Sequence, residues 1–272
     1  MSEMWNSVAP VWERNAAFVD GHLAGPTEAM LDAAGVGPGA AVLEVAAGPG
    51  GAGLAAAARV GAEGRVLLTD VAPDMVAAAA RRAADLPHVS AQIADELALG
   101  LEDGTFDAVI CRHGLMFCEP PSDAVREAAR TLRPGGRYAT LVWAARAENP
   151  WLGCVLDAVG EQFGVPFPPP HIAGPFALDD PGKFAAALTG GGLTDVTVER
   201  LPAPMRGPSL DEWWARVPEL AGPVAQALAG MEPDVRDAIR DRALAKGAAA
   251  ARDVDGGIEI DGAVLLGSGT RA

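Results

Sequence analysis

Residues 42–53, Val-Leu-Glu-Val-Ala-Ala-Gly-Pro-Gly-Gly-Ala-Gly, join an apolar segment to a cluster of glycines, and an alanine-rich run follows at Leu54. This pattern predicts a buried strand, a tight turn and a helix. Glycine lets such a turn fold tightly and lets the backbone approach a ligand, because no Cβ intervenes. The free N–H groups at the start of the following helix would face that ligand. The segment therefore indicates a binding site for a nucleotide-like cofactor.

A carboxylate follows the glycines at the sequence separation that is typical of a nucleotide-binding βαβ unit. Residues 65–70, Arg-Val-Leu-Leu-Thr-Asp, predict a second buried strand that ends at Asp70. Asp70 stands 20 residues after Gly50, the spacing at which an acid at the end of the second strand of a βαβ unit meets ribose hydroxyls. The predicted ligand is therefore one that carries adenosine.

The glycine spacing alone is compatible with two families of cofactor. Gly48, Gly50 and Gly53 fit the G-x-G-x-x-G pattern of dinucleotide-binding folds. A nicotinamide-dependent oxidoreductase would also need hydride-transfer residues such as Tyr-x-x-x-Lys. The chain has a single tyrosine, Tyr138, and its two lysines lie far from it in sequence, which makes this interpretation the weaker one.

The residues before the glycines favour the other cofactor. Glu44 followed by the small residue Ala46 and then by Gly48 and Gly50 resembles the first motif of the class I S-adenosylmethionine-dependent methyltransferases, x-[DE]-x-G-x-G-x-G. Ala46 replaces the first glycine of that motif, and Ala52 replaces a later one. The resemblance implies that Glu44 accepts hydrogen bonds from backbone amides of the glycine loop and contacts the methionine ammonium through water.

Residues 71–75, which follow Asp70, and residues 89–97 resemble the second and third motifs of the same family. The resemblance implies that Asp70 binds the ribose and that Val71 and Met75 pack on the adenine. It further implies that Asp95, with Glu96 beside it, receives the adenine amino group. The alternative for Asp95 is that its side chain only caps the end of a strand.

Two later segments extend the resemblance to roughly residues 40–145. Residues 104–111 are similar to the family's fourth strand, and residues 124–138 are similar to the helix and tight turn that precede its fifth strand. The nearest likeness is to the small-molecule branch, which includes ubiquinone and menaquinone C-methyltransferases and natural-product tailoring enzymes.

The N-terminal segment adds one more candidate. Residues 5–12 resemble an aromatic segment of the quinone-type enzymes, whose second aromatic residue closes over the cofactor. This implies that Trp12 contacts S-adenosylmethionine. Trp5 and Trp12 are also seven residues apart on one helical face, which is the spacing of ordinary core packing.

The resemblance places the loop after the fourth strand, Arg112 to Phe117, beside the transferred methyl group. His113 is the candidate general base, because an unperturbed imidazole has a pKa of about 6.5. The alternative is a histidine that only hydrogen-bonds its own backbone surroundings. Arg112 is expected to contact the cofactor or to cap the strand, and Phe117 is expected to contact the substrate.

Aromatic residues cluster around a proline-rich segment that predicts a lid. We expect Trp143, Trp151 and Phe176 to line the substrate pocket, with Phe163 and Phe167 nearby. Such a lining would suit a planar or lipophilic acceptor, because ligand pockets are mainly apolar with few polar anchors. Many of these residues would pack in the core in any case.

Composition excludes several classes of function. The formal net charge is −15, which repels a phosphate backbone and argues against nucleic-acid partners. No run approaches the ~20 apolar residues of a membrane span, and the start of the chain lacks the pattern of a secretory leader, so we expect a cytoplasmic protein with no membrane partner. The three cysteines have no metal-ligand spacing, and no metal is expected. A homo-oligomer is possible.

The alternation of strands and helices from residue 41 to residue 143 predicts an α/β fold. The resemblance specifies a Rossmann-like, seven-stranded, mostly parallel sheet with helices on both faces, an antiparallel C-terminal edge hairpin and a helical lid. The hairpin strands are expected at 194–201 and 258–266. The expected organisation is as follows: N-terminal helices over the cofactor site in residues 1–40, an S-adenosylmethionine-binding core in 41–145, a lid loop and helix in 146–180, and the rest of the sheet in 181–272 with a helical insertion at 205–255.

The function expected from the sequence is methyl transfer from S-adenosyl-L-methionine to a small lipophilic or aromatic acceptor, as in natural-product biosynthesis. One alternative keeps the fold and the cofactor for a non-methylating reaction, such as that of a pericyclase. The nicotinamide-dependent oxidoreductase remains the other. Neither the acceptor nor the methylated atom type follows from the sequence.

Overall fold

Seven strands form the larger sheet of the computed structural model, which describes residues 2–169 and 174–272. In chain order they are β1 (Ala41–Val45), β2 (Arg65–Asp70), β3 (Val89–Ile93), β4 (Phe106–Arg112), β5 (Leu132–Trp143), β6 (Leu193–Pro202) and β10 (Ala263–Arg271). Their spatial order is β3-β2-β1-β4-β5-β10-β6, and only β10 runs antiparallel to its neighbours. The predicted Rossmann-like sheet with an antiparallel edge is confirmed.

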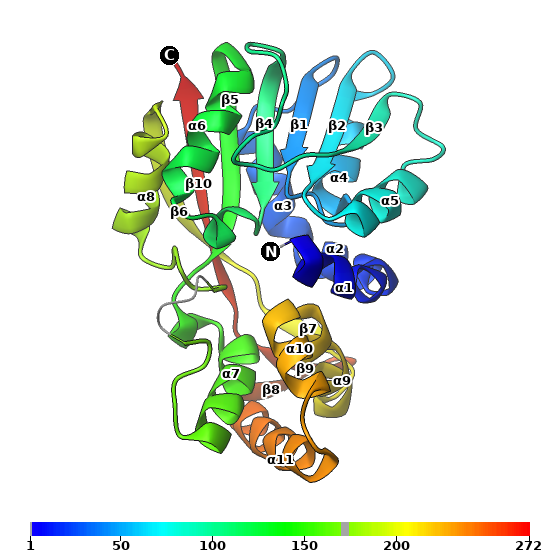
Figure 1. Ribbon diagram of the computed structural model, residues 1–272, viewed down its shortest axis with the longest axis vertical. Helices are drawn as coiled ribbons and strands as arrows, with labels where there is room; N and C mark the ends of the chain where they lie inside the picture. The colour runs from blue at the N-terminus through cyan, green and yellow to red at the C-terminus, as the bar shows by residue number, and fades with distance from the viewer. Residues whose placement is uncertain (1, 170–173) are drawn as a thin grey trace.

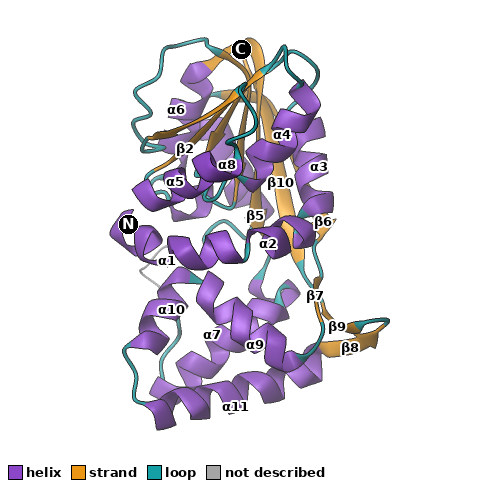
Figure 2. Ribbon diagram, turned by 90° about the vertical axis from the view of Figure 1, so that its right-hand side faces the viewer, coloured by secondary structure: helices purple, strands orange, loops and turns teal. Residues whose placement is uncertain are grey.

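Helices cover both faces of this sheet, as expected for parallel strands that are buried on both sides. The helices are α3 (Ala24–Ala33), α4 (Gly51–Val60), α5 (Pro73–Arg82), α6 (Pro121–Thr131) and α8 (Pro181–Gly190), with short 3₁₀ turns η1 (Leu115–Phe117) and η2 (Arg146–Glu148). α3 and α4 pack together on one face, and α6 and α8 pack together on the other (Figures 1 and 2). All five residues of the central strand β1 are buried, which puts the core on both sides of it.

Two N-terminal helices, α1 (Ser2–Arg14) and α2 (Ala16–His22), lie across the end of the sheet where the parallel strands terminate (Figure 1). A break at Asn15 separates the two helices. α1 is fastened to the β2–α5 turn: Asn6 and Asp74 exchange two hydrogen bonds of 2.9 and 2.8 Å, and Ser2 Oγ donates to the Val71 carbonyl oxygen at 2.8 Å. These contacts hold the N-terminal helices over the strand ends.

A second lobe, mostly helical, lies beyond α1 and α2 (Figure 2). It contains the helices α7 (Pro150–Phe163), α9 (Leu210–Leu220), α10 (Gly222–Ala229) and α11 (Pro233–Ala250), and a small sheet of β7 (Met205–Gly207), β8 (Ala251–Val254) and β9 (Gly257–Ile260). The predicted insertion at 205–255 is therefore not purely helical. The predicted lid helix, α7, packs against α11 and belongs to the same lobe.

The predicted strand at 258–266 is wrong in one respect: it is two strands in different sheets. β9 ends at Ile260 and β10 begins at Ala263. At Gly262 the chain passes so close to Ala203 that a Cβ would lie 2.1 Å from the Ala203 carbonyl oxygen. This crossing requires glycine and separates the small sheet from the large one.

The two lobes meet at Asn149, a fully buried side chain before α7. Its Nδ2 donates to the carbonyl oxygens of Ala144 and Ala263, each at 3.0 Å. Its Oδ1 accepts from the Ala263 N–H at 3.0 Å and from Trp151 Nε1 at 3.1 Å. One amide thus joins the end of β5, the start of β10 and the first turn of α7.

The proline-rich segment between α7 and α8 has no regular structure at 165–169 or 174–180, as its prolines predict. Residues 170–173 of the expected lid loop lie outside the described residues. Within the described ranges, no helix combines the length and the apolar composition that crossing a bilayer requires.

Candidate functional site

The site is built on the ends of three neighbouring parallel strands. From β1 the chain continues to β2 on one side of the sheet, and from β4 it continues to β5 on the other side. Such a reversal of strand order opens a crevice at the carboxyl ends of the strands. The β1–α4 turn, Asp70 at the end of β2 and Arg112 at the end of β4 meet there.

The turn after β1 has the backbone conformation that its glycines predict. Gly48 and Gly50 have φ of +53° and +81°. α4 begins at the next residue, Gly51. A Cβ at Gly50 would lie 2.9 Å from Leu68 Cδ1, so glycine also allows α4 to approach the sheet. Ala46, where the family motif has glycine, also has a positive φ, of +51°. This is a strained conformation for a residue with a Cβ.

Asp70 fixes the conformation of this turn. Its Oδ2 accepts from the Gly48 N–H at 2.8 Å, and its Oδ1 accepts from the Ala72 N–H at 2.9 Å. Burial raises the pKa of this carboxyl group, and the backbone N–H donors oppose that rise. The carboxylate still lines the crevice, where it can accept further hydrogen bonds from a ligand's hydroxyl groups.

Glu44 lies beneath the turn on β1, with 1% of its surface exposed. Its Oε2 accepts from the Gly53 N–H at 2.7 Å, which is the predicted contact with the glycine loop. Burial raises the pKa of Glu44 to about 8, against the lowering effect of the Arg112 charge and the Gly53 N–H. Glu44 and Gly50 do not line the crevice directly, so they support the loop from behind.

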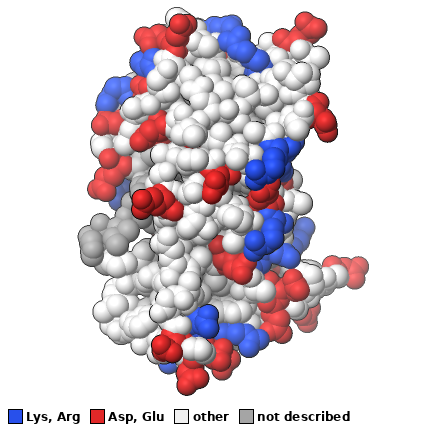
Figure 3. All heavy atoms as spheres, turned by 45° about the vertical axis from the view of Figure 1, so that its right-hand side comes forward, with Lys and Arg blue, Asp and Glu red and all other residues white. Residues whose placement is uncertain are grey.

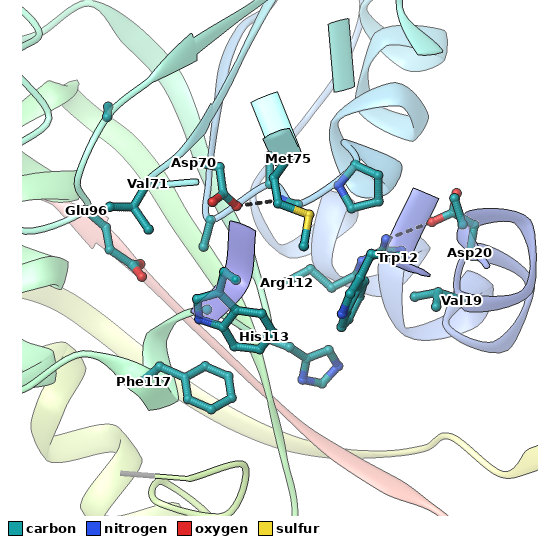
Figure 4. Close-up of a pocket in the computed structure, with 18 residues that line it drawn as sticks. Trp12, Val19, Asp20, Asp70, Val71, Met75, Glu96, Arg112, His113 and Phe117 are labelled. Carbon is teal, nitrogen blue, oxygen red and sulfur yellow. Dashed lines mark hydrogen bonds and ion pairs between the residues drawn. The ribbon is translucent and has the colours of Figure 1, made fainter. Parts of the chain in front are cut away.

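The crevice, here called the first cavity, is enclosed between the glycine turn and the N-terminal helices (Figure 4). Asp70, Val71 and Glu96 lie on one side of it, and Trp12 and Asp20 lie on the other. Its remaining lining is Trp5, Ala16, Val19, Ala46, Ala47, Gly48, Pro49, Met75, Ala94, Arg112, His113, Gly114 and Phe117. Most of the residues predicted to bind the cofactor are therefore brought together.

The chemistry of this lining fits an adenosine that carries an amino acid. Asp70 offers oxygens for hydroxyl groups, and Val71 and Met75 offer apolar surface for a flat base. Glu96 has a buried Oε2 with no partner among the described residues, so a ligand's amino group would satisfy it. At Gly48 a Cβ would meet no atom within 4 Å, which leaves the backbone open to a ligand.

Asp95 does not contribute to this cavity. Its side chain is exposed, and its Oδ1 accepts from the Leu97 N–H at 2.9 Å. Asp95 is thus absent from the lining in which its predicted adenine contact would be made, and its hydrogen bond to Leu97 fits the alternative of a strand-end cap. Its neighbour Glu96 points inward, and burial raises its pKa to about 7.

Asp20 is a lining residue that the sequence did not reveal. It forms ion pairs with Arg112 at 2.7 Å and with Arg82 at 2.6 Å. A Cβ at Gly51 would lie 1.8 Å from Asp20 Oδ1, so the carboxylate lies against the first turn of α4. Arg112 also donates to Thr27 Oγ1 at 3.2 Å. The pattern around Asp20 gave no signal because its partners are distant in sequence.

A second, larger cavity of about 470 Å³ lies between the strand ends and the helical lobe. Arg112 is the charged residue in its described lining. Six residues line both cavities and so separate them: Trp5, Trp12, Val19, Arg112, His113 and Phe117. The rest of the lining is Phe18, His22, Leu23, Met116, Trp143, Trp151, Leu152, Leu156, Phe167, Pro168, Pro169, Gly174, Pro175, Met205, Val217, Leu220, Ala221, Gly222, Val224, Gln226 and Ala227.

Aromatic rings form one wall of the second cavity. His113 stacks on Trp143 with ring centroids 4.0 Å apart, and Trp151 meets Trp143 edge-on at 4.9 Å. Trp143 and Trp151, predicted to line a substrate pocket, both line the second cavity. Phe176 does not line it and packs against the core instead, and Phe163 is 53% exposed.

His113 differs from its expected state. Its φ is +65°, and both ring nitrogens are buried without a partner among the described residues. Burial, reinforced by the nearby Arg112 charge, lowers its pKa well below 6.5. The imidazole is therefore neutral at pH 7 and a weaker base than the unperturbed value predicts.

The comparisons with known proteins agree with this geometry. Residues 42–136 match the family model described as a methyltransferase domain. The chain therefore contains a class I S-adenosylmethionine-dependent methyltransferase domain. The glycine turn that lines the first cavity lies within these residues.

Individual relatives extend the match unevenly. An uncharacterized protein of Mycobacterium bovis is 33% identical over 174 residues, 63% of this chain and 60% of that protein. The ubiquinone/menaquinone biosynthesis C-methyltransferase UbiE of Idiomarina loihiensis is 34% identical over 114 residues, 41% of this chain and 45% of that enzyme. The chain spans between 31% and 60% of the length of such curated relatives.

Among solved structures, YcgJ of Bacillus subtilis has a TM-score of 0.58 at 18% identity, and the match covers 90% of this chain and 97% of that one. At this identity the likeness concerns the fold alone. It agrees with the strand order found here.

Proposed function

We propose that this methyltransferase transfers the methyl group of S-adenosylmethionine to a small, neutral, apolar acceptor bound in the second cavity. The observation that carries the proposal is the pair of adjacent cavities. One has polar groups suited to adenosine and an amino acid, the other is apolar, and they share a wall of six residues.

When bound, the cofactor would supply an electrophilic methyl group: the methyl–sulfur bond of the sulfonium breaks, S-adenosylhomocysteine leaves as a neutral thioether, and the acceptor atom gives up one proton as it gains the methyl group. The chain then has mainly to align the acceptor and to exclude water. In this proposal Asp70 binds the ribose, Val71 and Met75 pack on the base, Glu96 accepts from its amino group, and Arg112 binds the carboxylate of the methionine portion.

The shared wall would position the two reactants. Trp12, Phe117 and His113 lie where the cavities meet, so their side chains would exclude water from the space between cofactor and acceptor. Trp5 packs edge-on against Phe117 at 5.1 Å and against Trp12 at 6.3 Å, which ties α1 to this wall. In this arrangement His113 acts as a neutral group beside the reacting centre.

The lining of the second cavity favours an acceptor without charge. The side chain of Arg112 is 9% exposed, is paired with Asp20 and, in this proposal, binds the carboxylate of the cofactor, so it is not free for an acceptor. The rest of the wall is mainly aliphatic and aromatic. Burying an ionised acceptor there would cost several kcal/mol without a free partner for its charge. Planar or lipophilic compounds would instead gain from burial.

The proposal is tested by label transfer from S-adenosyl-L-[methyl-14C]methionine to a panel of neutral naphthols and lipophilic phenols, alongside phosphorylated compounds of similar size. We expect label in neutral products. Ala221→Trp, which fills the second cavity at the junction of α9 and α10, should remove it, whereas Ala229→Trp at the exposed end of α10 should not. Transfer to the phosphorylated compounds alone would contradict the proposal.

A further inference from the structure

The second cavity contains a histidine with one ring nitrogen in use and one free. His22, the last residue of α2, places Nδ1 3.2 Å from the carbonyl oxygen of Pro204. Because a carbonyl oxygen only accepts, Nδ1 must carry the ring proton. Nε2 is then a hydrogen-bond acceptor, and it is buried with no partner within residues 2–169 and 174–272.

The ring of His22 is held in place before any ligand arrives. It lies nearly parallel to Phe18, with centroids 6.3 Å apart, and stacks at 6.1 Å from Trp143. Trp151 meets it edge-on at 5.8 Å. A side chain fixed on several sides loses little conformational entropy on binding, which makes it an effective specificity group.

The charge state of His22 suits an acceptor of hydrogen bonds. Burial lowers its pKa to about 4; the Pro204 carbonyl opposes this, and the Arg112 charge adds to it. At neutral pH the imidazole is therefore uncharged, with a lone pair on Nε2. A buried acceptor that lacks a partner costs free energy, so a ligand with a suitably placed donor is favoured.

We propose that His22 Nε2 accepts a hydrogen bond from a hydroxyl group of the methyl acceptor. The second cavity then selects neutral, apolar compounds that carry a hydroxyl group over the corresponding methyl ethers. This inference rests on the proposed function, since it takes the occupant of the cavity to be the methyl acceptor. It also means that an O-methylated product, which has lost its donor, would bind less tightly than the acceptor.

His113 is the other histidine in the described lining, and it lacks these features. Neither of its ring nitrogens has a partner among the described residues, so no contact fixes its tautomer. One face of its ring lies against Trp143 at 4.0 Å. The two histidines therefore make a matched pair, of which only His22 has an orienting hydrogen bond.

The test compares the binding of 2-naphthol and 2-methoxynaphthalene. The two differ only in that a methyl group replaces the hydroxyl hydrogen. Binding is followed by the fluorescence of the cavity tryptophans and confirmed by calorimetry. Wild-type protein should bind 2-naphthol about tenfold more tightly, the factor expected for one net hydrogen bond. His22→Phe should bring this ratio close to one. His113→Phe, which changes the wall between the cavities, should lower both affinities but preserve their ratio.

A ratio that survives in His22→Phe, or that is lost only in His113→Phe, would overturn the inference. Should His22→Phe fail to fold, nitrogen-detected NMR of the wild-type histidines still decides. We expect the Nδ1–H tautomer for His22 and a shift of its Nε2 resonance on addition of 2-naphthol but not of 2-methoxynaphthalene. The opposite tautomer, or equal shifts with both compounds, would contradict it.

S-adenosylhomocysteine binding, measured on the same preparations, separates this inference from the proposed function. Protein that binds S-adenosylhomocysteine but shows no preference for 2-naphthol contradicts only the role of His22. Protein that shows the preference but does not bind S-adenosylhomocysteine contradicts the proposed methyl transfer.

Discussion

Two buried carboxyl groups support the glycine turn in different ways. Glu44 lies behind the turn and bonds Gly53, while Asp70 lies in the first cavity and bonds Gly48. The sequence predicted both residues from the motif, and it predicted the Glu44 contact with the loop. It did not predict that burial raises both pKa values, because desolvation depends on the tertiary packing around each group.

The raised pKa of Glu44 has a consequence for stability. In the folded protein Glu44 keeps its proton up to about pH 8, whereas a glutamic acid in the unfolded chain loses it near the ordinary pKa of 4.5. The folded state thus binds more protons between these values, so the free energy of unfolding falls as pH rises through that window and levels off above it. Each unit of difference in pKa corresponds to about 1.4 kcal/mol.

Glu44→Gln should flatten this dependence, because glutamine keeps an oxygen for the Gly53 N–H but has no proton to lose. Urea unfolding at intervals from pH 5 to pH 9 measures the slope. The exposed control Glu63→Gln should retain the wild-type slope. Equal slopes in the wild type and Glu44→Gln would show that Glu44 is not protonated in the folded protein.

Asp70→Asn tests the ligand-facing carboxylate. Its charge-assisted hydrogen bonds to ribose hydroxyls are worth about 1.5–3 kcal/mol, so S-adenosylhomocysteine affinity should fall ~10- to ~100-fold. Because Asp70 also holds the backbone of Gly48 and Ala72, the variant is titrated well below its melting temperature. Asp85→Asn, an exposed change beyond α5, should leave the affinity unchanged. Unaltered affinity in Asp70→Asn would make Asp70 a purely structural cap.

At the scale of elements, the periodic segments were predictable and the crossings were not. The strands of the core and α8, capped by Asp180 through the Lys183 N–H at 2.7 Å, follow from local pattern. Ser209 likewise caps α9 by accepting from the Glu212 N–H. The break at Gly262 and the small sheet depend on a close approach to Ala203, a residue far away in sequence. No local pattern encodes such a contact.

The junction of β5, β10 and α7 at Asn149 is likewise not revealed by local sequence pattern, and it can be tested by substitution. Asn149→Ala would leave buried groups of Ala144, Trp151 and Ala263 without partners, at about 1–3 kcal/mol for each unsatisfied group. We expect a loss of ~2–4 kcal/mol in the free energy of unfolding by urea. The control Gln162→Ala, at the far end of α7, should change it by less than ~0.5 kcal/mol. A similar small effect in both variants would refute the joining role of Asn149.

In the whole molecule, most charged side chains lie on the surface, whereas the cavities lie in the interior. Acidic and basic side chains are interspersed on the face shown in Figure 3, and the excess of acids gives the net charge of −15. The N-terminal helices and the helical lobe face the ends of the strands (Figures 1 and 2). Residues of these elements line the two cavities. The sequence predicted the cofactor site from motifs, most of them in residues 42–112, but the second cavity is assembled from segments along most of the chain. His22, in the second cavity, and Asp20, in the first, lie outside those motifs and escaped prediction for that reason.

The first cavity should bind S-adenosylmethionine and not a dinucleotide. Calorimetric titration with S-adenosylhomocysteine and with NAD tests it most directly. We expect one S-adenosylhomocysteine site per chain with a dissociation constant in the micromolar range, no heat from NAD and no competition by it. Tight binding of NAD with no binding of S-adenosylhomocysteine would contradict the claim.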